Sequence, residues 1–317
     1  MTPLEAAWEA VLESPDDDRA LQVLTDALME RGDPHGELIR LQLAGDEEGA
    51  HTHLATYAAE LLGHPMHLTT WRPRFSRGFI SSVVIAEARE LEAVIGRPVG
   101  RLLRQLEVSP LAIEPIERIV EVLAQRGPRT LSSLRFGSAP GSSHPSGELE
   151  LAPLTARLHS LTHLVLGSWA LRFDGTSSRS LRSLSINLQN PARGLEDARF
   201  PHLEVLSLEL PFRRLDLPLS LLGGEVAPSL KSLSITGALW PQQLGDLSVS
   251  ALLRGLTRLE IAAEAETGWY TTLIETIDSY SHLERLDLVA DRHHPEWVQA
   301  VKQALPQATV REPRLRL

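Results

Sequence analysis

Apolar and polar residues follow a short pattern that returns along most of the chain. In the hexapeptide Leu161–Leu166, apolar residues occupy the first, fourth and sixth positions. The fourth and sixth positions are two residues apart, so their side chains point to the same face of an extended strand. Copies of the hexapeptide begin at Leu103, Leu131, Leu161, Leu181, Leu203, Leu230, Leu256 and Leu283. The pattern therefore predicts a series of short strands that bury the same face.

The copies begin 20 to 30 residues apart, and about 20 residues between them can return the chain in a short helix or loop. This spacing is typical of leucine-rich repeats, and residues 75–317 resemble that family. The resemblance implies an α/β fold, an irregular solenoid with parallel strands on its concave side. Many family members carry asparagine eight residues after the first leucine, where this chain has other residues such as Ala139, Trp169 and Gln189.

The first 62 residues follow a helical period instead. Apolar stripes predict helices over residues 2–14, from Leu21 to Leu28, from His35 to Leu43 and from Ala50 to Leu62. Asp16–Asp18 supplies start signals for the second of these helices, and Gly32 with Pro34 ends it. The sequence therefore predicts a helical segment before the repeats.

The run Glu30–Gln42, together with Pro15–Asp18 and Asp26, carries a second resemblance. It is similar to a small N-terminal domain of large paralogous families in myxobacteria and some planctomycetes, which is commonly joined to repeat regions. The resemblance implies two domains, with residues 1–70 as a helical cap or companion domain and residues 71–317 as the solenoid. A cap would cover the apolar end that an open solenoid exposes.

Further elements are predicted from local patterns between these regions. Residues 63–78 are predicted to form a linker or entry turn, and Gly137–Gly147 is predicted to form a loop. Strands are predicted at Phe79–Ile85 and Thr309–Arg311, and helices at Glu87–Ile95, Ile116–Gln125 and Glu296–Leu305.

Composition narrows the functional classes. The chain of 317 residues has no cysteine, which excludes disulfides, a thiolate nucleophile and a cysteine zinc site. No signal peptide or apolar run long enough to cross a membrane is recognisable, so we expect a cytoplasmic protein without membrane contact. Residues 1–70 hold 14 acidic residues and 3 arginines, which leaves 27 acids and 28 bases for the remainder of the totals of 41 and 31. This distribution lacks the basic stripe that nucleic-acid binding needs.

The search for catalytic and metal sites gives no candidate. The motifs Gly-x-Ser-x-Gly, Gly-x-Gly-x-x-Gly and Gly-Lys-Ser/Thr are missing, and we expect a protein that is not an enzyme and has no cofactor. Histidines occur in three pairs, but without cysteine they are more typical of a surface than of zinc ligands. They are His51 and His53, His64 and His67, and His293 and His294.

The residues beside the second leucine of each hexapeptide point away from the core, and they form our candidate binding face. They are serines in the middle repeats and charged residues toward the C-terminus, followed by Trp269 and Tyr270 as aromatic anchors at the rim. The candidate residues are Ser183, Ser185, Ser207, Ser232, Ser234, Arg258, Glu260, Trp269, Tyr270, Arg285 and Asp287. A solubilising polar sheet face accounts for the strand positions equally well.

These observations favour a non-enzymatic, intracellular protein–protein interaction scaffold that binds a protein partner through the concave face and its rim. They favour neither nucleic acid nor a small-molecule substrate as ligand. The alternative is a GTPase-activating protein or another regulator of a small GTPase, because one branch of the leucine-rich-repeat family has that role. Arg258 or Arg285 would then stabilise the charge on the transferred phosphate. The partner, the oligomeric state and a role for the convex loops stay open.

Overall fold

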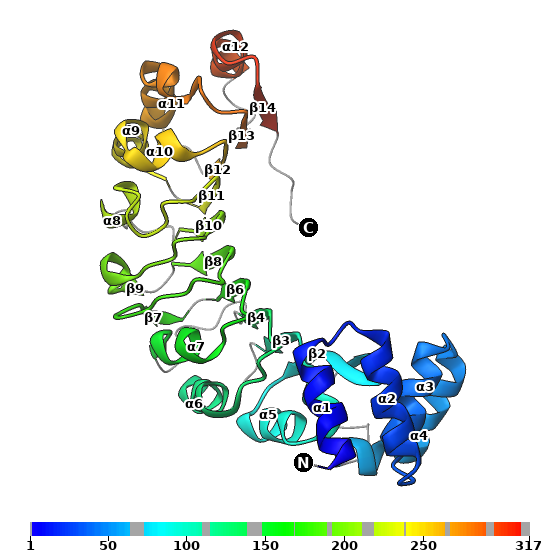
Figure 1. Ribbon diagram of the computed structural model, residues 1–317. Coiled ribbons are helices and arrows are strands. Elements are labelled where there is room, and N and C mark those ends of the chain that lie inside the picture. The colour runs from blue at the N-terminus through cyan, green and yellow to red at the C-terminus, as the bar shows by residue number, and fades with distance from the viewer. Residues whose placement is uncertain are drawn as a thin grey trace. The chain divides into compact units, whose positions relative to one another are not determined.

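The computed structural model describes residues 2–63, 73–109, 115–137, 148–167, 169–188, 192–210, 219–237, 239–263, 267–289 and 295–311. The chain divides into two compact units, residues 1–139 and residues 140–317 (Figure 1). Helices and strands are mixed in both units, and most neighbouring strands are parallel. The predicted α/β class is confirmed.

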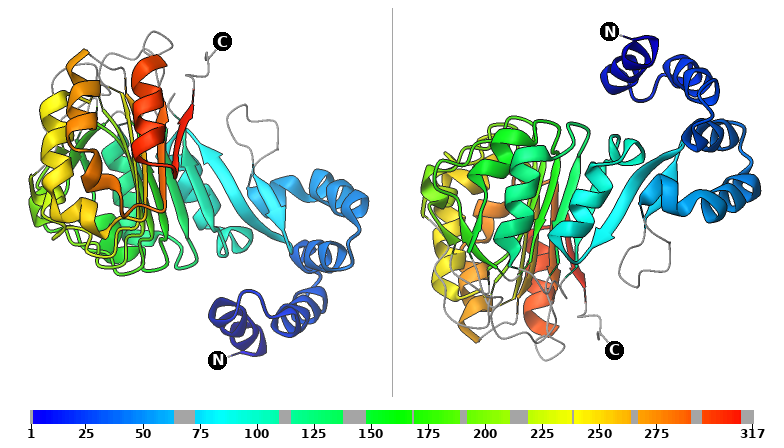
Figure 2. Two further views of the ribbon diagram at one scale, coloured as in Figure 1. Left: turned by 90° about the horizontal axis from the view of Figure 1, so that it is seen from above. Right: turned by 90° about the horizontal axis from the view of Figure 1, so that it is seen from below.

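Four helices open the first unit, and each packs against the next (Figure 2). They are α1 (Pro3–Glu13), α2 (Asp18–Met29), α3 (Pro34–Leu43) and α4 (Glu47–Leu62). The side chains of Asp17, Asp33 and Asp46 cap the last three by accepting backbone N–H hydrogen bonds. The predicted helices are confirmed, although α4 begins three residues before the predicted Ala50 because Asp46 caps it.

The apolar faces of α1, α2 and α3 form one core with the first strand region of the same unit. Its buried residues include Trp8, Val11, Leu21, Phe79 and Leu102. Burial of each large side chain contributes about 1.5–3 kcal/mol. The guanidinium of Arg101 also lies 4.5 Å from the centre of the Trp8 ring, which adds a cation–π contact. The helices are therefore attached to the strands by a substantial apolar interface.

The structure corrects the predicted linker at residues 63–78, because part of it is a strand. Strand β1 (Arg74–Ser76) pairs antiparallel with β2 (Phe79–Ile85). Arg77 and Gly78 connect them and have φ values of 56° and 82°. A two-residue turn with positive φ at both positions matches the twist of a hairpin. The sequence signal was weak because Arg-Gly replaces the usual Asn-Gly.

The rest of the first unit continues from β2. Strand β2 pairs in parallel with β3 (Gln105–Val108), and β3 pairs in parallel with β4 (Ser133–Phe136). Helix α5 (Ala88–Ile95) follows β2, helix α6 (Ile116–Arg126) follows β3, and the two helices pack together. A 3-10 helix, η1, is formed by Pro98–Gly100. Both helices and the strand β2 agree with the sequence prediction.

The second unit holds the other repeats. Its main strands are β6 (His163–Leu166), β8 (Ser183–Asn187), β10 (Val205–Glu209), β11 (Ser232–Gly237), β12 (Arg258–Ala263), β13 (Arg285–Val289) and β14 (Ala308–Arg311). They pair in that order, and every described pair is parallel. The helices are α7 (Ala152–Arg157), α8 (Leu219–Leu222), α9 (Pro241–Val249), α10 (Ala251–Gly255), α11 (Thr267–Glu275) and α12 (Pro295–Ala304), with 3-10 helices η2 (Leu195–Asp197) and η3 (Ile277–Tyr280).

The return segments lie on one side of these strands. Helices α9, α10 and α11 lie together beside β11 to β13 in both views (Figures 1 and 2). A second, smaller sheet is formed by β5 (Glu148–Glu150), β7 (Ala170–Arg172) and β9 (Ala192–Arg193), again with parallel pairs. The segments between hexapeptides are thus helical in some repeats and extended in others.

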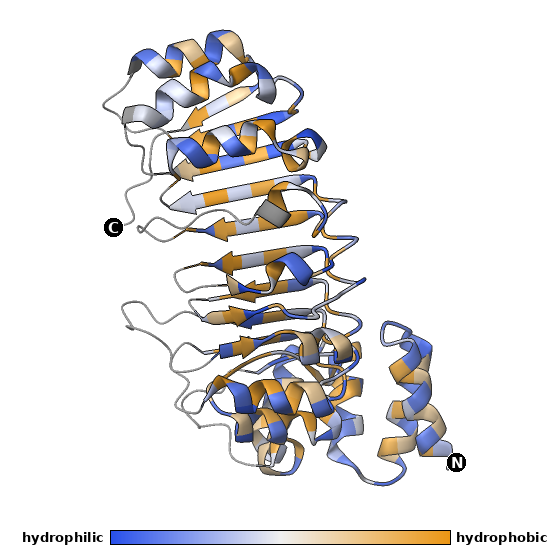
Figure 3. Ribbon diagram, turned by 90° about the vertical axis from the view of Figure 1, so that its left-hand side faces the viewer, coloured by the Kyte–Doolittle hydropathy of each residue, from blue (hydrophilic) through white to orange (hydrophobic). Residues whose placement is uncertain are grey.

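The leucines of successive hexapeptides are in register. Cα pairing aligns Leu164, Leu184, Leu206, Leu233, Leu259 and Leu286, each at most 3% exposed. A parallel row, which includes Leu208 and Ile235, is at most 1% exposed. Figure 3 shows these rows as hydrophobic bands that continue from strand to strand. The prediction that the second leucines form one buried row is confirmed.

Candidate functional site

The main candidate site is the outward face of the strands in the second unit, which we call the strand face. It consists of two columns of side chains. The first column is His163, Ser183, Val205, Ser232, Arg258 and Arg285, and the second is Val165, Ser185, Ser207, Ser234, Glu260 and Asp287. Neighbouring strands lie about 4.8 Å apart, so each column is a closely spaced row.

Small side chains occupy the middle of the strand face. All five predicted serines are partly exposed, so a partner's backbone can approach this part of the sheet closely. Val205 lies between Ser183 and Ser232 in the first column and is 42% exposed. Its apolar surface is absent from the predicted site, although its place in the hexapeptide gives it the same orientation as the serines.

Charged residues occupy the C-terminal part of the strand face. The guanidinium of Arg285 donates hydrogen bonds of 2.5 and 3.3 Å to Asp287, and this contact raises the pKa of Arg285 above its ordinary value. The hydroxyl of Ser234 donates a hydrogen bond of 3.2 Å to Glu260. Arg258 is exposed. The pairing brings the four predicted charged residues together on neighbouring strands β12 and β13.

The predicted aromatic rim is wrong for Trp269 and Tyr270. Both lie on α11 and are buried, with 1% and 6% exposure. The Trp269 ring packs edge-on against Trp297, with 6.0 Å between the ring centres. The Tyr270 ring stacks on Trp297, with 4.4 Å between the ring centres. The aromatic cluster therefore forms part of the core under α11 and α12. The sequence also places Trp169 and Phe212–Arg214 a few residues after predicted strands, at the same rim. Trp169 is buried as well, and Phe212–Arg214 lies outside the described residues.

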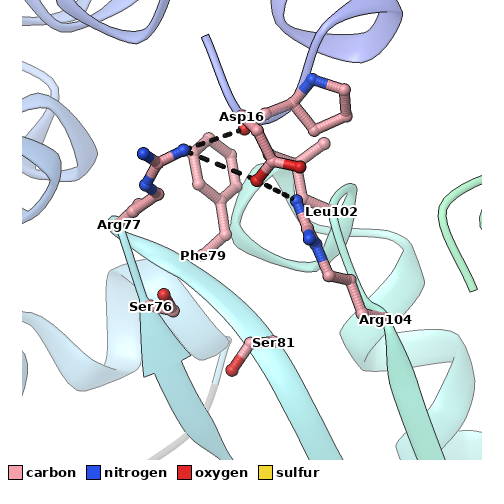
Figure 4. A pocket seen from close by; sticks show the side chains of 8 residues that line it. Asp16, Ser76, Arg77, Phe79, Ser81, Leu102 and Arg104 are labelled. Atoms are coloured by element: carbon pink, nitrogen blue, oxygen red, sulfur yellow. Dashed lines mark hydrogen bonds and ion pairs between the residues drawn. The ribbon is translucent and has the colours of Figure 1, made fainter. Parts of the chain in front are cut away.

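A second candidate site lies within the first unit, where a cavity of about 160 Å³ opens beside the β1–β2 hairpin (Figure 4). We call it the hairpin cavity. Its lining comes from the α1–α2 loop, the hairpin and the segment that enters β3: Pro15, Asp16, Ser76, Arg77, Phe79, Ser81, Leu102 and Arg104.

Two arginines converge on one carboxylate at the hairpin cavity. The Asp16 Oδ1 atom lies 2.6 Å from a guanidinium nitrogen of Arg104 and 3.6 Å from one of Arg77. The hydrogen bond from Arg104 lowers the pKa of Asp16 below its ordinary value. Arg77 also donates a hydrogen bond of 2.5 Å to Asp18. Figure 4 shows Arg77 and Arg104 reaching Asp16 from opposite sides.

The backbone of Arg77 is strained. Its φ of 56° lies in the left-handed region, which costs a residue other than glycine roughly 1–2 kcal/mol. Its side chain then contacts Pro15, Asp16 and Asp18. The hairpin therefore holds an arginine at a position where glycine, asparagine or aspartate would be less strained. Sequence reasoning missed this site because its residues come from distant segments, with Asp16 and Arg104 lying 88 positions apart.

A buried histidine lies near the hairpin cavity. His35 is 1% exposed, and its Nε2–H donates a hydrogen bond of 2.9 Å to the carbonyl of Gly78. Its ring lies between Trp8 and Phe79, with ring centres 5.9 and 4.9 Å away. Burial lowers the pKa of His35 from 6.5 to about 4, so the ring is neutral at pH 7.

Among the residues that the structure describes, no cluster of three or more histidine, aspartate or glutamate side chains could hold a metal ion. In the same part of the chain, no helix has the length and apolarity needed to cross a membrane. Of the paired histidines, His53 donates an Nε2–H hydrogen bond of 2.8 Å to the carbonyl of Pro34. His64, His67, His293 and His294 lie outside the described residues.

Comparison with known proteins finds no match, either to a family model or to a curated protein. The function must therefore be inferred from the sites themselves.

Proposed function

We propose that this chain is a leucine-rich-repeat solenoid that binds a protein partner through the strand face, as a non-enzymatic scaffold of the cytoplasm. The observation that supports this proposal most directly is the register of the strands. In the hexapeptides from β8 to β13, one set of alternate positions is filled by buried leucines and isoleucines, while the other carries serines, Val205 and charged residues. Such a continuous surface suits recognition of another protein.

The chemistry of the strand face fits this role. The serines and Val205 provide a surface without long side chains that a partner must displace. Beside them, Arg258 and Glu260 can set the orientation of the partner, since charged groups steer association and penalise wrong pairings. Because Trp269 and Tyr270 lie in the core, the free energy of binding the partner would come from the residues of the strand face.

The test compares two double variants as bait in a pull-down from lysate of the source organism, read by mass spectrometry. Ser207→Arg with Ser234→Arg places bulk and charge on the strand face. Asp246→Arg with Val249→Arg changes two exposed residues of α9 and serves as the control. A partner that binds the unchanged chain and the control, but is lost from the strand-face variant, supports the proposal. Equal capture by all three baits contradicts it.

A GTPase-activating role is the second candidate, and it now rests on Arg258 more than on Arg285. Arg285 is held by Asp287, whereas Arg258 is exposed on the neighbouring strand. An arginine that stabilises phosphoryl transfer must be able to reach the phosphate. Timed phosphate release from a GTP-loaded small GTPase, with the unchanged chain and Arg258→Ala, tests this role. No acceleration by the unchanged chain rejects it.

A further inference from the structure

We propose that the hairpin cavity binds the carboxylate of a small apolar acid, and that Asp16 occupies the carboxylate position as a tethered competitor. This inference is independent of the function proposed for the strand face. It rests on three features of the first unit: two converging guanidinium groups, an apolar floor and a competitor that is exposed to solvent.

The guanidinium groups define the polar end of the cavity. Arg77 and Arg104 both lie within 3.6 Å of the same carboxylate oxygen of Asp16. Arginine recognises carboxylates through charge-assisted hydrogen bonds, and two arginines around one oxygen define a position for such a group. The strained backbone of Arg77 brings one of these groups to this position. Strained residues of this kind are found preferentially at functional sites.

Apolar side chains define the inner end of the cavity. Phe79 is 2% exposed and Leu102 is 5% exposed, and Pro15 completes this lining. Ser76 and Ser81 also line the cavity, and Figure 4 shows both on the hairpin strands, on the side of Phe79 away from Asp16. A cavity of about 150 Å³ can hold a molecule the size of benzene. The volume of about 160 Å³ therefore suits an acid with a body the size of one apolar side chain.

Asp16 is suited to be displaced. Its side chain is 73% exposed and belongs to the short loop between α1 and α2. Ion pairs between exposed groups contribute little to stability, so an incoming carboxylate can replace Asp16 without unfolding the unit. Because Asp16 is tethered beside the arginines, it also competes at a high effective concentration. Removing its charge should therefore strengthen binding of an external acid.

The experiment uses the full chain and isothermal titration calorimetry. The probes are N-acetyl-leucine and N-acetyl-leucinamide, which differ only in the carboxylate. We expect N-acetyl-leucine to bind and the amide to bind at least about tenfold more weakly, because the neutral amide lacks the negative charge that strengthens hydrogen bonds from the two guanidinium groups. Asp16→Asn should tighten binding of the acid about fivefold or more. Arg104→Gln should weaken it at least about tenfold.

Arg118→Gln is the matched control, because Arg118 is another exposed arginine of the same unit that pairs with Glu121. It should leave binding unchanged. The proposal is overturned if N-acetyl-leucine binds neither the unchanged chain nor Asp16→Asn, or if inorganic phosphate binds as tightly as the acid. An Arg104→Gln variant that loses thermal stability but still binds normally overturns it as well. That result leaves the arginines a purely structural role.

A hexapeptide that ends in leucine distinguishes the two sources of such an acid. Tighter binding of the peptide than of N-acetyl-leucine identifies the C-terminus of another protein as the ligand. Equal or weaker binding of the peptide identifies a free small acid.

Discussion

The side-chain oxygen of Gln42 accepts a hydrogen bond of 2.6 Å from the backbone N–H of Gly78. His35 lies seven residues earlier on the same face of α3 and donates a hydrogen bond to the carbonyl of Gly78, so α3 contacts both backbone groups of this turn residue. Both side chains belong to the run Glu30–Gln42. That run therefore attaches the N-terminal helices to the β1–β2 hairpin, a role that the sequence alone did not indicate.

This attachment requires glycine at position 78. Its φ is 82°, and an added Cβ would lie 2.3 Å from Cγ1 of Ile39. Gly78→Ala should destabilise the fold by about 2–4 kcal/mol, from the left-handed strain and the overpacking together. Gly45→Ala is the control, because Gly45 also has positive φ but has nothing within 4 Å of an added Cβ. Urea denaturation measures both, and equal losses would show that the contact with Ile39 is not tight.

The neutral form of His35 should make stability depend on pH. The folded pKa of about 4 lies below the ordinary 6.5, so the unfolded chain binds a proton between these values that the folded chain does not. The free energy of unfolding therefore falls as pH falls from 6.5 to 4, by about 3 kcal/mol at most. Denaturation curves at several pH values should show a smaller fall for His35→Gln. Parallel curves for the two proteins would assign the acid sensitivity to other groups.

The alternation on β10 can be tested with two adjacent residues. Leu206 is 3% exposed and Val205 is 42% exposed. Leu206→Ala should cost about 2–5 kcal/mol, as a buried leucine does. Val205→Ala should stay within about 0.5 kcal/mol, as at most exposed sites. Chemical denaturation gives both values, and a loss at Leu206 as small as that at Val205 would mean that this register is wrong.

Trp269 should behave as a core residue and not as a binding anchor. Trp269→Ala removes a ring that contacts Tyr270 and Trp297, and the loss should be about 3–5 kcal/mol. A thermal melt followed by circular dichroism measures it. Ile274→Ala on the same helix is the control, because Ile274 is 40% exposed and its loss should be small. A stable Trp269→Ala protein would return this residue to the list of interface candidates.

Residues 1–70 should not be removable without damage to the remainder. Their deletion uncovers Phe79 and Leu102, which are 2% and 5% exposed in the intact chain. Exposed apolar surface of this kind favours aggregation. The fragment 71–317 should therefore aggregate or melt at a much lower temperature, as measured by light scattering and calorimetry. A soluble fragment with an unchanged melting temperature would mean that the helices are a separate domain.

Elements with a strong local signal could be predicted from the sequence. The leucine rows follow from a period of two within each hexapeptide, and the first helices follow from apolar stripes and aspartate caps. Strand β1 could not be predicted, because it is only three residues long and no familiar turn sequence follows it. Helix α11 could not be predicted from the sequence, because Gly268, Thr271 and Thr272 are poor helix formers and indicate a loop around Trp269.

The candidate sites divide in the same way. The strand face could be predicted because neighbouring positions in a strand determine which side chains point outward. The hairpin cavity could not be predicted from the sequence. Its residues Asp16 and Arg104 are 88 positions apart and meet only through the packing of α1 and α2 on β2. Contacts at that separation depend on the tertiary arrangement, which local patterns do not contain.

The register of the second unit also separates two kinds of evolutionary constraint. Strands β8 and β10 contribute inward leucines, which are buried and must fit their neighbours, and outward residues, which are partly or fully exposed. If the strand face binds a partner as proposed, a substitution at Ser207 or Ser234 should therefore alter binding with little loss of folding stability. A duplicated repeat of 20 to 30 residues would lengthen the surface by one strand and leave the others in place. Under the proposed function, changes at the outward positions would change the ligand and leave the buried leucine rows as they are.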